Sequence, residues 1–65
     1  MDKKLEFKIF CLESYKQAHN LTGKEVYKIF ETYKVLDYLD DYYDVLHSTG
    51  QKYIVEDIEK YLQAI

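Results

Sequence analysis

The sequence predicts an all-α fold: one compact bundle of three or four short helices, with residues 1–65 forming a single helical domain. The chain contains no proline and only two glycines, which favours helices joined by short turns over a sheet with many hairpins. Its hydrophobic content of 48% is typical of a globular protein and not of a disordered one. Apolar residues also recur at helical spacing along most of the chain.

Residues 2–19 form the first predicted helix, and its apolar residues do not make one stripe. One side carries Leu5, Ile9 and Leu12, and the other carries Phe7, Phe10, Cys11, Tyr15 and Ala18. A helix with two apolar sides is either central in its own bundle or shared with a second molecule. A chain this short has few other helices to cover both sides, so a homodimer through the first helix stays open.

The second predicted helix, residues 23–34, has the clearest start signal in the sequence. Thr22 is followed three residues later by Glu25, the spacing of a capping box. Leu21 before the cap and Val26 at the fourth helical position form a hydrophobic staple. The predicted buried stripe consists of Val26, Ile29, Phe30 and Tyr33.

The third predicted helix, residues 35–46, follows a weakly marked break near residues 34–36. At 100° per residue its acidic residues and one histidine fall within an arc of about 120°. This acidic stripe consists of Asp37, Asp40, Asp41, Asp44 and His47. Apolar residues fill most of the remaining circle, so the helix would bury a wide face and expose one acidic stripe. Gly50 suits the turn that follows.

Residues 53–64 form the last predicted helix. Its apolar residues recur at helical spacing, at Ile54, Ile58, Tyr61, Leu62 and Ile65. The start is ambiguous, because residues 53–55 have a composition that also suits a short extended segment.

Charge is unevenly distributed along the chain and argues against nucleic-acid binding. The net charge is −3; residues 1–34 carry seven lysines and five acids, and residues 35–65 carry two lysines and seven acids. Arginine, the usual residue for bidentate recognition of phosphate and guanine, is missing from the sequence. No stretch resembles a signal peptide or a membrane span. We therefore expect a cytoplasmic protein that binds neither nucleic acid nor membrane.

The side chains that could act in catalysis or metal binding are better explained by structural roles. Cys11 lies in an apolar run, which is typical of a buried structural thiol and not of a nucleophile. His19 and His47 fit helix ends, where the dipole favours a histidine. The spacing of Asp40, Asp44 and His47 would permit a metal ion, but a solvated acidic face or a docking face fits it better. We expect no catalytic, cofactor or metal site, and therefore no enzyme.

The tyrosines divide into two predicted groups. Those on the apolar stripes, expected at the core or its edge, are Tyr33, Tyr42 and Tyr61. Those expected to be exposed are Tyr27, Tyr38 and Tyr53. An exposed tyrosine beside an acidic face is typical of an interface anchor.

A helix-turn-helix is an alternative interpretation of residues 22–47. The two helices have suitable lengths, but the second, which would enter the major groove, is the acidic one and phosphates would repel it.

Several motifs carry a resemblance to a known family: GKEVYKIF (residues 23–30), VLDYL (35–39), YDVLHSTG (43–50) and IVEDIEKYL (54–62). With FCLESYK (10–16), they cover nearly the whole chain. The sequence resembles a family of small bacterial proteins known as a domain of unknown function. That resemblance implies a short, mostly helical protein. The resemblance further implies an association with toxin-like, ADP-ribosylating proteins, and so a role as an antitoxin or accessory partner.

The function we expect is a protein–protein interaction module that docks a basic partner. The predicted partner-binding residues are Asp37, Tyr38, Asp40, Asp41, Asp44 and His47. Charge would steer the encounter, and tyrosines with apolar neighbours would supply affinity. A DNA-binding regulator and a self-associating domain of other role are the alternatives.

Overall fold

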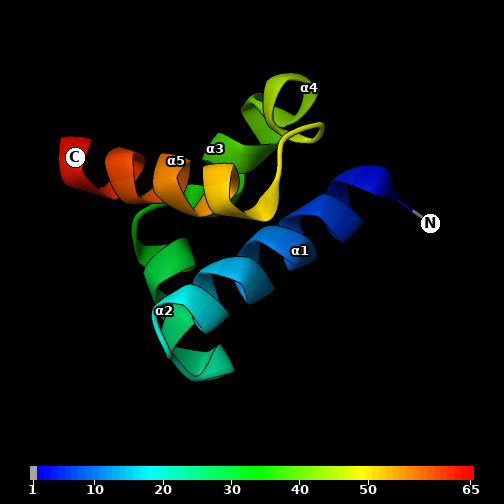
Figure 1. Ribbon diagram of the computed structural model, residues 1–65. Helices are drawn as coiled ribbons and strands as arrows, with labels where there is room; N and C mark the ends of the chain where they lie inside the picture. The colour runs from blue at the N-terminus through cyan, green and yellow to red at the C-terminus, as the bar shows by residue number, and fades with distance from the viewer. Residues whose placement is uncertain (1) are drawn as a thin grey trace.

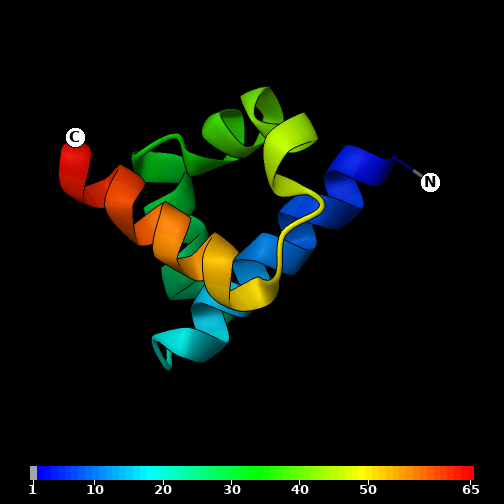
Figure 2. The ribbon, with the colours of Figure 1, turned by 45° about the horizontal axis from the view of Figure 1, so that its top comes forward.

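The computed structural model describes residues 2–65 as an all-α protein with no strand in that range, which confirms the predicted fold class. The five helices are α1 (Lys3–Ala18), α2 (Gly23–Thr32), α3 (Val35–Asp41), α4 (Tyr43–Leu46) and α5 (Gln51–Ala64). Figure 1 shows α5 meeting α1 near the middle of the molecule, with α2 at the lower left and the short α4 at the top, and Figure 2 shows the start of α5 in front of α1.

One apolar core holds these helices together, and α1 is central to it. Helix α1 packs against α5, α2 and α3. The buried hydrophobic side chains are Phe7, Cys11, Tyr15, Val26, Phe30, Val35, Leu39, Leu46, Ile54, Val55 and Ile58. Every helix contributes at least one of them. The core therefore depends on contacts between segments far apart in the sequence.

The two apolar sides of α1 have different environments. Phe7, Cys11 and Tyr15, spaced one turn apart, point into the core. Leu5 and Ile9 on the other side are each 54% exposed. Phe10 and Ala18, which the helical pattern places on the side of Phe7, Cys11 and Tyr15, are also exposed. The neighbouring helices therefore cover this side of α1 only in part.

The turn between α1 and α2 follows the local signals in the sequence. Asn20 adopts a left-handed conformation with φ 53°. The Leu21 N–H donates to the Lys16 carbonyl at 3.0 Å, and the Asn20 N–H donates to the Gln17 carbonyl at 3.3 Å. This pair of bonds is a Schellman motif, which satisfies carbonyls that a helix end leaves free. At the start of α2, both capping-box bonds between Thr22 and Glu25 are formed, which confirms that prediction.

The break between α2 and α3 lies at Lys34, within the predicted interval. Lys34 has φ 56° and ψ 38°, a left-handed conformation that normally favours glycine. No glycine occurs there, so the sequence marks the break only weakly. Tyr33, predicted to lie at the core or its edge, is instead the C-cap of α2 and is 48% exposed.

Replacing Lys34 with glycine is expected to raise the free energy of unfolding by about 0.5–1 kcal/mol. A non-glycine residue in the left-handed conformation costs roughly 1–2 kcal/mol, and glycine avoids that cost. The greater entropy of glycine in the unfolded chain offsets about half of this gain in stability. Urea denaturation measures the change. The matched control is Lys28→Gly in the middle of α2, which should lower stability by about 1 kcal/mol. If both variants lowered the free energy of unfolding by the same amount, Lys34 would not have the left-handed conformation.

The acidic segment is two helices instead of one, contrary to the prediction. Helix α3 ends at Asp41, and Tyr42 (φ −106°, ψ 19°) separates it from the four-residue α4. The break removes the i,i+4 repulsion between Asp40 and Asp44 that a continuous helix would carry. It also lets the Tyr43 ring pack edge-on against Phe7, with centroids 5.4 Å apart. As a result, Tyr42 is exposed, and its assignment to the core edge was wrong.

Helix α5 begins at Gln51 and is continuous through residues 53–55, so the extended alternative is wrong. Ile54 and Ile58 are buried as predicted, Tyr61 lies at the core edge as predicted, and Ile65 is exposed. Among residues 2–65, no helix combines the length and the apolar character that a membrane crossing requires.

Candidate functional site

The acidic stripe predicted from one helix is divided between α3 and α4, and its members have different environments. Asp40 is half-buried and lies against two lysines of α1: its Oδ1 is 3.3 Å from Lys8 Nζ and 3.8 Å from Lys4 Nζ. Much of its charge is therefore balanced within the molecule. Asp37, Asp41 and Asp44 are exposed.

Tyr38 joins α3 to α5 and is not an exposed anchor. Its hydroxyl donates to Asp57 Oδ2 at 2.5 Å, and its ring stacks on Tyr61 with centroids 4.3 Å apart. Burial raises the pKa of Tyr38, and the hydrogen bond to Asp57 and the charge of that carboxylate raise it further. The prediction that Tyr38 is exposed was wrong, because Asp57 and Tyr61 lie on a helix that follows much later in the chain.

Both histidines lie at helix ends, as predicted. His47 is the C-cap of α4, and its Nδ1 is 2.8 Å from the Tyr43 carbonyl. Since a carbonyl only accepts, Nδ1 carries the hydrogen in this bond. His19 is the C-cap of α1, and its Nε2 lies 2.8 Å from Glu59 Oε2 of α5. These contacts give both rings a structural role.

Five exposed acidic and apolar residues remain on α3, on α4 and between the two helices. We call this set the acidic knuckle; it consists of Asp37, Asp41, Tyr42, Asp44 and Val45. Its three carboxylates have no ion-pair partner within the part of the chain that the structure describes. Tyr42 is 51% exposed and Val45 is 65% exposed. Sequence reasoning missed both apolar members, because their exposure depends on a break that no glycine or proline marks.

The structure brings together no group of three or more histidine, cysteine, aspartate or glutamate side chains able to hold a metal ion in residues 2–65. Asp40 faces α1, whereas Asp44 and His47 lie beyond the break. Cys11 is fully buried, and that burial raises its pKa from 9.0 to about 12. The thiol is therefore protonated at neutral pH and is a poor nucleophile.

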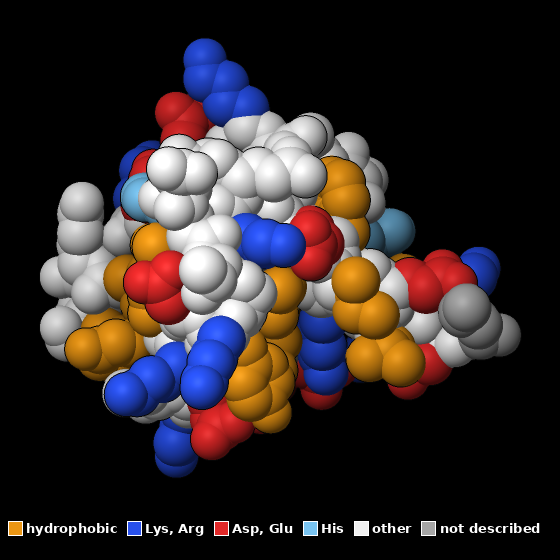
Figure 3. Space-filling model, turned by 90° about the horizontal axis from the view of Figure 1, so that it is seen from below, with side chains coloured by type: hydrophobic (Ala, Val, Ile, Leu, Met, Phe, Trp, Pro, Cys, Tyr) orange, Lys and Arg blue, Asp and Glu red, His pale blue; other side chains and the backbone are white. Residues whose placement is uncertain are grey.

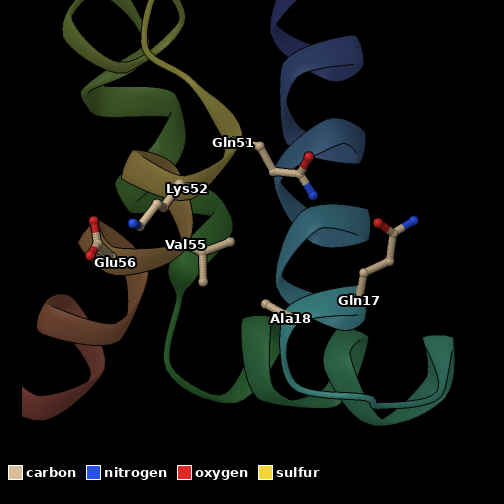
Figure 4. Close-up of a pocket in the computed structure, with 6 residues that line it drawn as sticks. All are labelled: Gln17, Ala18, Gln51, Lys52, Val55 and Glu56. Carbon is tan, nitrogen blue, oxygen red and sulfur yellow. The ribbon is translucent and has the colours of Figure 1, made fainter.

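A pocket of about 550 Å³ lies between the end of α1 and the start of α5. Its lining residues are Gln17, Ala18, Gln51, Lys52, Val55 and Glu56. Figure 4 shows Gln51 reaching from α5 toward α1, with Lys52 and Glu56 on the far side of α5. The lining contains no cysteine or histidine, and its side chains do not form a nucleophile–base pair.

Comparison with protein families identifies the family of this chain. A family model described as "Protein of unknown function (DUF3791)" matches residues 6–64. No curated protein and no solved structure matches the chain. The family match covers nearly the whole chain and confirms the predicted resemblance to a family of unknown function. This protein therefore belongs to the DUF3791 family.

Proposed function

We propose that this chain is a protein–protein interaction module that binds a basic protein partner through the acidic knuckle. The observation that carries the proposal is the exposure of Tyr42 and Val45 among carboxylates that have no ion-pair partner in residues 2–65. Exposed apolar side chains rimmed by charge are typical of protein interfaces. The acids would meet lysine or arginine on the partner.

Each part of the knuckle has a separate role in this mechanism. The carboxylates of Asp37, Asp41 and Asp44 speed the encounter with a positively charged surface, an effect that salt weakens. Tyr42 and Val45 supply contact area that leaves water on binding. Complex formation should therefore be faster at low salt, while its lifetime should depend on the two apolar side chains.

The other predicted binding residues support the knuckle indirectly. Tyr38 holds α3 against α5 through Asp57, and its ring lies 4.9 Å from the Tyr42 ring. Asp40 holds α3 against α1 through Lys8. His47 ends α4. We therefore assign these three residues to positioning the surface.

A finer version of the proposal makes the partner a toxin-like protein, which this chain would neutralise. That version rests on what the sequence resemblance implies, and the matched family is itself one of unknown function. The knuckle requires a basic partner with an apolar contact site, and a toxin-like protein could meet that requirement.

Reversing two charges of the knuckle, Asp41→Lys with Asp44→Lys, is expected to weaken capture of the partner at least about tenfold. The reason is that attraction becomes repulsion at the contact surface, while both side chains stay exposed and the fold is preserved. Affinity capture from an extract of the producing cells, quantified by mass spectrometry, measures the loss.

The matched control is Glu6→Lys with Glu56→Lys, two exposed acids of α1 and α5. It changes the net charge by the same amount and should leave capture unchanged. If both double variants lose the same proteins, net charge and not the knuckle governs binding, and the proposal is wrong.

A further inference from the structure

The outer side of α1 is an apolar surface that no helix within residues 2–65 covers. Leu5 and Ile9 are each 54% exposed, and Leu12 is half-buried. Tyr27 of α2 and Leu36 of α3 join them around a groove of about 270 Å³. Figure 3, which views the molecule from below, shows hydrophobic side chains gathered on both sides of a lysine on this face. The α4 part of the acidic knuckle lies elsewhere, since α4 is at the top of Figure 1, whereas Asp37 directly follows Leu36.

The order of residues on this side matches the seam of a parallel two-stranded coiled coil. In a heptad labelled a to g, the spacing of Leu5, Ile9 and Leu12 places them at d, a and d. Isoleucine at a with leucine at d favours two parallel strands. Lys16 follows at the next a position and ends the apolar seam there. We propose that a second copy of this chain packs its α1 in parallel against the outer side of α1.

Charge beside the seam favours this occupant and this direction. Lys8 lies at a g position, and Glu13, five residues later, lies at an e position. In a parallel pair, the g position of one helix faces the following e position of the other. Lys8 of each copy therefore lies beside Glu13 of the other copy. In an antiparallel pair, e faces e, and the acids Glu6 and Glu13 would repel their counterparts. Only the parallel arrangement is complementary.

Both members of the proposed ion pair are accessible. The Lys8 side chain is 27% exposed and lies 3.3 Å from Asp40, while the Glu13 side chain is 49% exposed and lies 3.7 Å from Lys16. Lys8 also lines the groove itself. Each side chain can therefore reach across the interface, and Lys8 would then lie between Asp40 and the partner's Glu13.

The groove extends the contact beyond the short seam. Stable dimers bury about 800 Å² per partner, more than one and a half heptads supply. Tyr27 and Leu36 continue the apolar surface from α1 onto α2 and α3. The rotation axis of the dimer runs parallel to α1, so each copy presents its groove to the e flank of the other.

The first test is the oligomeric state of the full chain. Sedimentation over a concentration series should show a reversible dimer, and Ile9→Glu should raise its dissociation constant at least about 30-fold. Ile9 is half-exposed in the monomer, so circular dichroism should stay unchanged. Val45→Glu, at an exposed apolar residue of the knuckle, should leave the dimer intact. A wild-type chain that is monomeric up to about 1 mM overturns the proposal, as does a dimer insensitive to Ile9→Glu.

The second test is the direction of the pair. In a parallel seam each d residue lies beside its own counterpart, close enough for a disulfide. Leu5→Cys and Leu12→Cys, each alone, should therefore yield an oxidised covalent dimer. The wild-type chain should not, because Cys11 is buried. In an antiparallel pair, a residues face d residues, so residue 9 of one copy would lie beside residue 12 of the other. Linkage only when Leu12→Cys is mixed with Ile9→Cys would contradict the parallel arrangement.

Discussion

Replacing Phe30 with alanine is expected to lower the free energy of unfolding by about 3–5 kcal/mol, enough to unfold much of the population. Phe30 is fully buried on α2, and its ring lies 5.7 Å from the Tyr15 ring of α1. Its loss removes apolar burial and leaves a cavity between these helices, while a domain this small has little stability to spare. Urea denaturation followed by circular dichroism measures the effect.

Tyr27→Ala is the matched control, because it removes an aromatic side chain of the same helix that is 53% exposed. Its expected cost is below about 1 kcal/mol. If Phe30→Ala and Tyr27→Ala lowered the free energy of unfolding by similar amounts, α2 would not bury Phe30 more than Tyr27. That result would contradict the packing described above.

Stability is expected to fall steeply above about pH 9, because the thiol of Cys11 ionises far more easily in the unfolded chain. Burial raises its pKa from 9.0 to about 12. Between these values the unfolded chain has lost the proton and the folded chain keeps it. Cys11 therefore contributes full stability below about pH 9, and that contribution is lost as pH rises through about 12. The slope from this one group approaches about 1.4 kcal/mol per pH unit.

Cys11→Ala isolates this contribution from those of tyrosines and lysines that also titrate at high pH. The variant should lose about 1 kcal/mol at pH 7, where a small cavity replaces the sulfur. Between pH 9 and 11 its stability should fall less steeply than that of the wild type. Urea denaturation over this pH range measures both slopes, and parallel curves would contradict a buried, protonated Cys11.

Helix starts and ends with local signals could be predicted from the sequence. The capping box at Thr22, the turn after His19 and the fold class depend on neighbouring residues or on composition, which the sequence displays directly. The break at Tyr42 could not be predicted, because no glycine, proline or cap marks it. The packing of Tyr43 on Phe7, more than thirty residues away, is part of what favours it.

The candidate site likewise combines features that the sequence could predict with features that depend on contacts between distant segments. Its exposed acids, Asp37, Asp41 and Asp44, were predicted from the sequence and are exposed in the structure. Periodicity could not show that Tyr38 and Asp40 have partners within the molecule, since Asp57 and Lys8 lie on other helices. A single-helix pattern identifies which residues share a face; it does not identify what another helix brings to that face.

Photo-cross-linking at Val45 tests the central claim most directly. A photoreactive residue replaces Val45 in the knuckle, and a second variant carries it at the exposed Glu56 of α5 as the control. The account predicts that illumination in the producing cells links the Val45 variant to a basic protein, while the Glu56 variant gives no such adduct. Absence of a basic adduct at Val45, or the same adduct at both positions, would contradict the acidic knuckle as the partner-binding surface.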